Sequence, residues 1–259
     1  MMQVFKNISL RHALRVWYRN AFVYKRLIKV GILPNFLEPL LYLLSMGIGV
    51  GRYVDGIQGM SYLQFIGPGF IASTAMFGAT FEITFSSYVR MIWQKTFDSI
   101  ISTPVSAEDV VLGEILWAAT KGALFGLIMM LVLALFGLIQ SWYALWIIPF
   151  LMVSNLMFAV LGMIVTSVVP SIDLFNMYFT LFVTPSFLLS GIFFPISGLP
   201  RLAQWLANLV PLYHMVEVVR PLAWGKPSVA MGLHALAILI FIVVLLPIPL
   251  YRMARRLVN

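Results

Sequence analysis

Long apolar runs separated by short polar connections dominate the pattern along the chain. Six runs reach the roughly 20 residues that a membrane-spanning helix needs. They are rich in Leu, Ile, Phe, Met and Gly throughout, whereas the strands of a membrane barrel alternate in polarity over about ten residues. The pattern therefore predicts an all-α integral membrane protein with six transmembrane helices, at Gly31–Val50, Tyr62–Val89, Gly113–Ile139, Leu145–Val169, Leu174–Phe194 and Val229–Tyr251.

No stretch outside these runs is long enough for a soluble domain, so residues 1–259 are predicted to form a single transmembrane domain. We divide it into an interface helix over 1–30, spans one to five over 31–194 with a cytoplasmic connection at 90–112, an outer segment at 195–228, and span six at 229–251.

The segment before the first run has helical periodicity. Its apolar residues recur at steps of four and three, and a separate basic row runs beside them. A helix with an apolar stripe, a basic face and a Trp is typical of the membrane interface. We interpret this segment as an N-terminal amphipathic interface helix that acts as a gate or docking helix, with an orientation anchor as the simpler alternative. The stripe is Leu10, Leu14, Trp17, Ala21, Tyr24 and Ile28, and the basic row is Arg11, Arg15 and Arg19.

Composition agrees with a membrane protein. Hydrophobic residues make up 61% of the chain and charged residues 10%, and the mean hydropathy is +0.97. A soluble domain is about 45–50% apolar and about 25% charged. These values exclude a soluble enzyme and a nucleic-acid-binding module. The chain has no cysteine, which excludes disulfides and thiol chemistry.

The distribution of Lys and Arg predicts the orientation. Twelve basic residues precede the first run, follow the second or lie in the C-terminal tail, and four lie on the opposite side. Basic residues concentrate in cytoplasmic connections. Both termini are therefore predicted to be cytoplasmic, with 90–112 inside and 195–227 outside.

The connection 90–112 is the longest on the predicted cytoplasmic side. Phe97, Ile100 and Ile101 are apolar positions of a short helix that ends at Thr103-Pro104, because the residue before a proline is disfavoured in helical conformation. Ser106 then precedes acidic residues, as expected of an N-cap that begins the next helix. The segment is either a docking element for a cytoplasmic partner or a plain connection.

The outer segment 195–227 is too polar and too rich in proline to span the membrane. It holds an apolar stripe and a second short run, Met215–Val219. We interpret it as a pair of short helices that re-enter the outer leaflet and form an exit gate, with a surface-lying loop as the alternative. The stripe is Leu202, Trp205, Leu206 and Leu209.

Two charged residues lie at matching depth within consecutive runs. Glu82 comes eight residues before Arg90, and Lys121 comes eight residues after Gly113, so each lies about 12 Å from the inner border. We expect them to form an intramembrane ion pair that is either functional or purely structural. Glu38 lies at similar depth in the first run.

Motifs of several enzyme classes are missing from the sequence. It contains no GxxxxGK[ST] phosphate loop and no HExxH metal motif. His12, His214 and His234 are far apart in sequence, so a histidine metal site is not expected. The acids Asp98, Glu108 and Asp109 have no accompanying cluster that would suit a glycosyltransferase.

Two further segments carry a resemblance to a known family. The inner connection reads Ser102-Thr103-Pro104-Val105-Ser106 and is followed by Leu112-Gly113-Glu114, and the outer segment begins with FFPISGLP at 193–200. Over nearly its whole length the chain resembles the membrane subunit of type-2 ABC exporters. Phe81-Glu82 and 88–91 are most similar to the NodJ branch, which is associated with export of lipo-oligosaccharides.

The resemblance implies a separate ATPase. Two permease copies would pair with two ATP-binding subunits, which hold ATP and Mg, so this chain would bind no cofactor and would not itself be an enzyme. The helix in the inner connection would be a coupling helix that docks on the ATPase. Its contact residues would be Phe97, Asp98, Ile100, Ile101, Thr103 and Pro104.

The resemblance also implies a substrate path between the two permeases, lined by spans two and five. Single aromatic residues there are also explained by packing or by contact with lipid. The implied path residues are Phe77, Phe81, Glu82, Phe85, Tyr178 and Phe182, and the implied outer gate is Phe194, Pro195, Leu199 and Trp205.

The function expected from these observations is the permease of an ATP-driven exporter in a bacterial inner membrane. The cargo would be a lipid-linked saccharide, a lipo-oligosaccharide or a similar amphipathic molecule, with no nucleic acid partner. Drug or antibiotic efflux is the alternative within the family. A membrane enzyme or assembly scaffold without transport is the alternative outside it.

Overall fold

The computed structural model describes residues 8–54, 56–57 and 59–258, and their side chains apart from those of 27–36, 38, 39 and 258. Within these ranges the chain forms helices and turns, with no β-strand. The α-helices are α1 Leu10–Leu44, α2 Tyr62–Phe81, α3 Thr96–Ile101, α4 Ala107–Leu135, α5 Ile147–Val168, α6 Phe175–Tyr178, α7 Thr184–Leu188, α8 Arg201–Asn208, α9 Pro211–Trp224, α10 Val229–Leu245 and α11 Pro247–Val258.

Helix α2 lies at the centre of the bundle and packs against α1, α4, α5 and α9. Small residues allow the close approach to α4. A Cβ atom on Gly122 would lie 2.6 Å from the carbonyl oxygen of Ala75, so only glycine fits at this crossing. Two π-helical turns, Glu82–Ser86 and Val89–Trp93, continue α2 toward α3. We call residues 82–93 the α2 extension.

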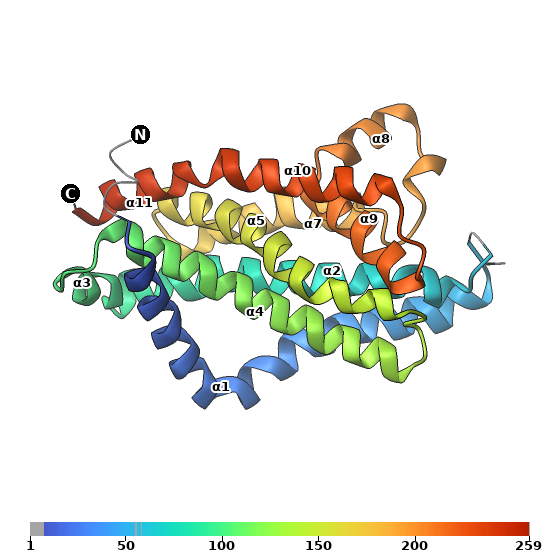
Figure 1. Cartoon of the computed structure of the whole chain (residues 1–259), viewed down its shortest axis with the longest axis horizontal. Coiled ribbons are helices and arrows are strands. Elements are labelled where there is room, and N and C mark those ends of the chain that lie inside the picture. Colours follow the sequence, from blue (N-terminus) through green and yellow to red (C-terminus); the bar gives the residue numbers. More distant parts are fainter. Residues whose placement is uncertain (1–7, 55, 58, 259) are drawn as a thin grey trace.

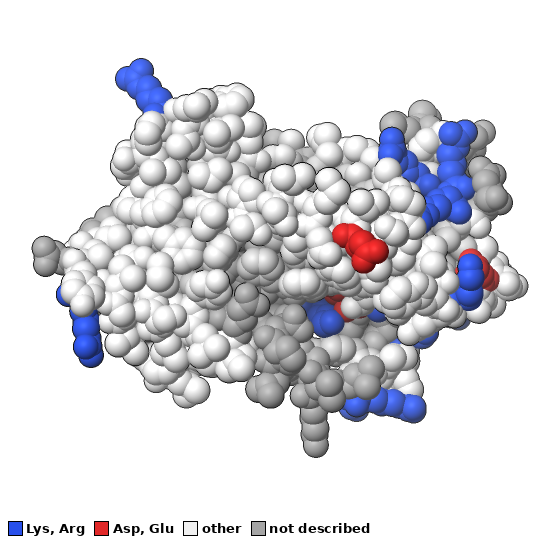
Figure 2. Space-filling view, turned by 180° about the vertical axis from the view of Figure 1, so that it is seen from behind, with Lys and Arg blue, Asp and Glu red and all other residues white. Residues whose placement is uncertain are grey.

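The bundle has two distinct ends. The start of α1, the short helix α3 and the end of α11 lie together, whereas α8 and the loop after residue 52 lie at the opposite end (Figure 1). We call these the inner and the outer end, following the predicted orientation. In the view from behind, uncharged side chains cover most of the middle, and Lys and Arg gather mainly at one end (Figure 2).

The described residues contain three helical stretches that are long and apolar enough to cross a membrane, Ala107–Leu135, Trp142–Val168 and Val229–Leu257. Two shorter apolar stretches, Leu40–Arg52 and Ile172–Leu188, accompany them. The total of six spans stays a prediction. The predicted fifth span is too long, because helix α7 ends at Leu188 and a turn over 189–195 follows.

The predicted division between an interface helix over 1–30 and a first span stays a prediction. Helix α1 is assigned as one helix from Leu10 to Leu44, although it bends away from the bundle near its middle (Figure 1). Its packed face also differs from the predicted stripe. Ala13 and Val16 are buried against Gly113 of α4, whereas Leu10 and Leu14 are 61% and 48% exposed.

The outer segment forms two short helices, α8 and α9. They differ in burial, because α9 packs against α2 and α10 while the apolar stripe of α8 is exposed. Leu202 and Trp205 are 71% and 62% exposed. Helix α8 therefore presents an apolar face that no described part of the chain covers.

Candidate functional site

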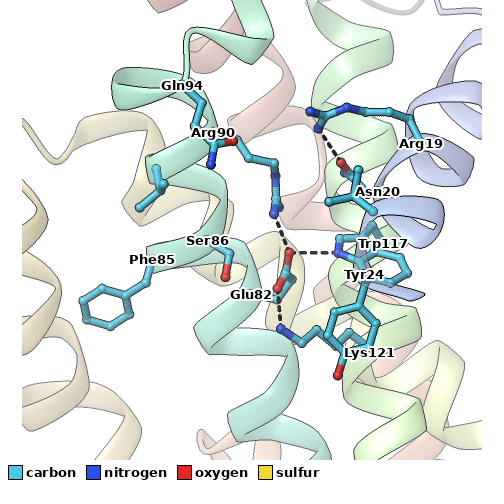
Figure 3. A pocket seen from close by; sticks show the side chains of 12 residues that line it. Arg19, Asn20, Tyr24, Glu82, Phe85, Ser86, Arg90, Gln94, Trp117 and Lys121 are labelled. Atoms are coloured by element: carbon cyan, nitrogen blue, oxygen red, sulfur yellow. Dashed lines mark hydrogen bonds and ion pairs between the residues drawn. The ribbon is translucent and has the colours of Figure 1, made fainter. Parts of the chain in front are cut away.

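A cavity of about 480 Å³ opens between α1, the α2 extension and α4 (Figure 3). Helix α1 contributes Arg19, Asn20 and Tyr24 to its wall. The α2 extension, the residue directly after it and α4 contribute the remaining polar groups, which are Glu82, Ser86, Arg90, Gln94, Trp117 and Lys121. Most of these groups are charged or aromatic, which is unusual for a cavity inside an apolar bundle.

Glu82 is the best-connected carboxylate of the cavity. Its side chain is 3% exposed and lies 2.6 Å from Lys121 Nζ and 2.7 Å from Arg90 Nη1. Trp117 Nε1 donates a further hydrogen bond of 2.8 Å. The structure thus brings together Glu82 and Lys121, which sequence analysis placed at the same depth. Burying a charge is costly unless it is paired and hydrogen-bonded, and here both oxygens have partners.

Arg90 connects Glu82 to a second acid. Its Nη2 atom donates to Glu114 at 2.5 Å, while Nη1 faces Glu82. Asn20 of α1 donates to Glu114 at 2.7 Å. The sequence predicts that Arg90 lies in the cytoplasmic loop, and the structure corrects this, because its side chain is 14% exposed and lies inside the network.

The spacing of these residues contains a signal that sequence analysis missed. Glu114, Trp117 and Lys121 follow one another at steps of three and four residues, so they share one face of α4. On the α2 extension, Glu82 and Arg90 are eight residues apart, yet they pair with each other and both face α4. The π-helical turns, which bond i to i+5 and hold more residues than an α-turn, accompany this alignment.

A row of aromatic rings runs beside the cavity. Phe77, Phe81 and Phe85 lie at four-residue steps, with ring centroids 6.4 and 5.7 Å apart. Phe179, which sequence analysis missed, stacks on Phe81 at 4.5 Å. Tyr178 and Phe182 stack on each other at 5.5 Å, and Tyr178 contacts Phe179.

This row, which we call the aromatic row, continues in both directions along the bundle. Phe85 contacts Phe175 toward the inner end, and Phe77 contacts Phe187 toward the outer end. The row is not fully covered, since Phe81 is 38% exposed. All five predicted path aromatics therefore belong to one connected surface, and Phe85 joins that surface to the cavity.

The inner connection forms α3 as predicted, but the role expected of Phe97 as a docking contact is contradicted. Its ring is fully buried against the inner core, which includes Met91 and Val110, so it fastens α3 to the permease. Ile100 and Ile101 are half-buried. The exposed residues of the connection are Trp93, Gln94, Lys95, Asp98, Ser99, Ser102, Thr103 and Pro104.

The predicted N-cap at Ser106 is confirmed. Its hydroxyl accepts a hydrogen bond from the Asp109 backbone N–H at 3.1 Å, which completes a capping box at the start of α4. Asp109 also accepts a hydrogen bond of 2.6 Å from the Ser9 backbone N–H. The cap therefore fastens the start of α1 to the start of α4.

At the predicted outer gate, Phe194 is 39% exposed and Trp205 is 62% exposed, while Pro195 and Leu199 are half-buried. The turn that carries Phe194 is held by a residue that sequence analysis placed among the outer-side basic residues. Arg220 of α9 is buried and donates from Nη2 to the Gly191 carbonyl oxygen at 2.6 Å. Its guanidinium also lies 4.1 Å from the ring centroid of Phe65 on α2.

Two histidines that are distant in sequence meet at the outer end. The Nδ1 atoms of His214 on α9 and His234 on α10 are 2.8 Å apart, and His214 Nε2 lies 2.9 Å from the Asn208 carbonyl oxygen. Within the described residues, no group of three or more His, Cys, Asp or Glu is placed to hold a metal ion. The side chain of Glu38 lies outside the described residues.

Comparison with known proteins agrees with this architecture. The model of the ABC-2 type transporter family matches residues 12–224. Nodulation protein J of Rhizobium meliloti (strain 1021) is 38% identical over 88% of this chain and 87% of its own length. Nodulation protein J of Sinorhizobium fredii (strain NBRC 101917 / NGR234) is 38% identical over 94% of this chain and 93% of its own.

A more distant relative is the inner membrane transport permease YadH of Escherichia coli (strain K12). It is 22% identical over 44% of each chain. The family match covers both the charged cavity and the aromatic row, and the two nodulation relatives cover most of the chain. The chain therefore belongs to the ABC-2 type transporter family and is a membrane-spanning transport subunit of that family.

Proposed function

We propose that the chain is the permease of an ATP-driven exporter that moves an amphipathic saccharide, such as a lipo-oligosaccharide, out across a bacterial inner membrane. The observation that carries this proposal is the aromatic row. It connects α2 to the 172–188 segment and runs from the inner cavity toward the outer turn. The similarity to Nodulation protein J supports the choice of cargo.

The chemistry of the aromatic row suits a cargo with both sugar and lipid parts. Aromatic rings offer large flat apolar faces, while the hydroxyl of a Tyr adds a polar group at the edge. The C–H faces of sugar rings and acyl chains both pack on such surfaces. Sliding over Phe77, Phe81 and Phe179 would break no strong polar contact at any step, which favours movement along the row.

ATP hydrolysis is assigned to a separate subunit, present in two copies, that docks on the inner connection. The revised docking surface is the exposed part of that connection, with Trp93 at 65% exposure as its largest apolar group. Helix α10 suits a contact with lipid or with a second permease copy, because Ile238 is its one buried residue among those described. Both termini are assigned to the cytoplasm.

Export assays on the permease together with its ATP-binding subunit test the function. Phe81→Ala and Phe179→Ala remove stacked faces from the aromatic row and should each lower lipo-oligosaccharide export about tenfold at normal permease yield. Phe136→Ala serves as the matched control, because Phe136 is 55% exposed outside the row. Equal export by all three variants would rule out the aromatic row as the path.

The docking assignment has its own test. Trp93→Asp places a carboxylate on the exposed connection without touching the buried ring of Phe97. Retention of the ATP-binding subunit on co-purification should fall about tenfold, since exposed Trp residues are frequent interface anchors. Tyr53→Asp, at a 90% exposed aromatic of the outer end, should leave retention unchanged. Undiminished retention with Trp93→Asp would contradict docking through this loop.

A further inference from the structure

The charges of the inner cavity do not balance among themselves. Three cations line it, Arg19, Arg90 and Lys121, together with the acid Glu82. A second acid, Glu114, is bound directly to Arg90. Three positive charges thus face two negative charges, which leaves the cavity with one unmatched cation.

The unmatched cation is Arg19. Arg90 uses Nη1 on Glu82 and Nε and Nη2 on Glu114, and Lys121 is bound to Glu82. Arg19 instead donates from Nη1 to the Asn20 amide oxygen at 2.9 Å, and within the described part of the chain it forms no ion pair with an acid. Its side chain lies above the network, at the edge of the cavity (Figure 3).

The Tyr24 hydroxyl is a second polar group of the cavity that is not fully used. It is buried and has no hydrogen-bond partner among the described residues, although its ring contacts Lys121. A buried hydroxyl without a partner is unfavourable, so this donor is available to a ligand. Arg19 and Tyr24 lie five residues apart on α1 and both line the cavity.

Resting on the export function proposed above, we propose that this cavity binds one singly charged anionic group carried by an amphiphile in the inner leaflet. A phosphodiester, a sulfate ester or a carboxylate has this chemistry. Arg19 supplies the compensating charge, because guanidinium groups bind such oxyanions with paired hydrogen bonds. The Tyr24 hydroxyl points away from Arg19 (Figure 3), so it supplies a donor for a second polar group of the same molecule. Glu82 and Glu114 disfavour a dianion, since the cavity has only one positive charge in excess.

The surroundings of the cavity favour an amphiphile over a free ion. Phe85 belongs both to the cavity wall and to the aromatic row, so an anionic group beside Arg19 leaves the rest of the molecule next to that row. Val23 lines the cavity on the α1 side and is 44% exposed. The anion therefore has two sources, a membrane phospholipid or the exported molecule, and the same groups would recognise either.

The test uses the full permease in zwitterionic phosphatidylcholine nanodiscs, with and without phosphatidylglycerol as the probe. Binding of phosphatidylglycerol is measured by native mass spectrometry. Arg19→Gln should weaken binding at least about tenfold, Arg19→Lys should restore part of it, and Tyr24→Phe should weaken it a few-fold. Arg15→Gln is the matched control, because Arg15 is exposed one turn earlier on the same helix. Thermal unfolding verifies that each variant is folded.

A competition arm distinguishes the two sources. Displacement of bound phosphatidylglycerol by an anionic lipo-oligosaccharide, but not by its neutral analogue, would assign the cavity to the cargo. Retention of phosphatidylglycerol against both would assign it to the phospholipid. Displacement by inorganic phosphate alone would show that the amphiphile is not required and would overturn that part of the proposal. Equal binding by native chain and Arg19→Gln would overturn the site, whereas normal binding with no export would count against the proposed function alone.

Discussion

At the inner end of the bundle, paired full charges join the α2 extension to α4, and α1 adds a hydrogen bond from Asn20. The outer end instead joins α9 to its neighbours through hydrogen bonds and ring contacts. Arg90 alone links two buried acids at the inner end. At the outer end, Arg220 is held to neighbouring elements by a backbone carbonyl and a Phe ring, and its 3.6 Å ion pair with Glu217 stays within α9. His214 is held by another imidazole.

The two kinds of contact differ in what it costs to break them. Removing one partner of a buried ion pair leaves a charge without compensation and costs about 3–5 kcal/mol. A hydrogen bond from a charged group such as Arg220 contributes about 1.5–3 kcal/mol net, and a neutral hydrogen bond contributes about 0.5–1.5 kcal/mol. The inner end therefore suits a fixed connection between helices, and the outer end suits a part that opens during transport. Four predictions test this contrast.

The largest effect is expected at Arg90. Arg90→Met removes the cation that Glu82 and Glu114 share and leaves buried negative charge without compensation. The free energy of unfolding should therefore fall by about 3–5 kcal/mol. Folded yield and thermal unfolding of the purified permease measure this loss. Lys95→Met is the control, because Lys95 is 67% exposed and its contact with Asp98 is a surface ion pair, which is worth about 0–1 kcal/mol. Similar losses in both variants would refute a fixed inner network.

A smaller effect is expected at Glu82 and Lys121. Glu82→Gln and Lys121→Met should each lower stability, but by less than Arg90→Met, because the ion pair between Arg90 and Glu114 remains in both variants. The double variant should lose less than the sum, with a coupling of about 0.5–3 kcal/mol. A double-mutant cycle by thermal unfolding measures it. Strict additivity would contradict the 2.6 Å contact between the two groups.

The sequence predicts those contacts of the network that follow from the positions of residues along consecutive helices, and not those that depend on local changes in helix geometry. Matching depth on consecutive helices was enough to pair Glu82 with Lys121. Arg90 directly follows the last apolar residue of the second run, Val89, and therefore looks like the start of a loop. Its place in the network depends on π-helical turns that no residue pattern predicts. Glu114 belongs to a segment that resembles a family motif, but nothing in that segment predicts its ion pair with Arg90.

The same distinction explains the error on α3 and the contact at the outer end that the sequence does not predict. The apolar positions of α3 predict a helix with one apolar face, but not whether that face meets the permease or a partner. The structure shows that the permease itself covers Phe97. His214 and His234 are twenty residues apart in different helices. Their contact depends on how α9 packs against α10, which periodicity within either helix does not reveal.

At the outer end, Arg220→Gln should loosen the 189–195 turn. It removes the hydrogen bond to Gly191 and the contact with Phe65, so stability should fall by about 1–3 kcal/mol, less than at Arg90. Because the native chain has no cysteine, a cysteine introduced at Ser197 reports opening through its rate of labelling by an impermeant thiol reagent. Faster labelling is expected. An unchanged rate, with stability lost, would assign Arg220 a purely packing role.

The smallest effect is expected at the histidine pair, where protonation decides the contact. His214 Nε2 faces the Asn208 carbonyl oxygen and must donate to it, so in the neutral ring Nδ1 accepts a hydrogen bond from His234 Nδ1–H. A first added proton can go to His234 Nε2 without breaking this bond. A second proton must go to His214 Nδ1. Both facing nitrogens then carry a hydrogen on a cationic ring, so the hydrogen bond is lost and the two rings repel each other. Acidification should therefore weaken the contact between α9 and α10, and the sign is a loss of stability as pH falls.

Thermal unfolding of the permease between about pH 7.5 and about pH 5.5 measures this effect, a range in which histidines change charge. The native chain should lose about 0.5–1.5 kcal/mol more than His234→Gln over that range. His12→Gln is the control, because His12 lies at the inner end beside Asp109; its pH response at the outer end should match the native chain. Labelling at Ser197→Cys separates the two ends, since acid should speed it in the native background and in His12→Gln but not in His234→Gln. The same pH response in His234→Gln as in the native chain would show that the outer end is not held by this pair, and the contrast between the two ends would then rest on Arg220.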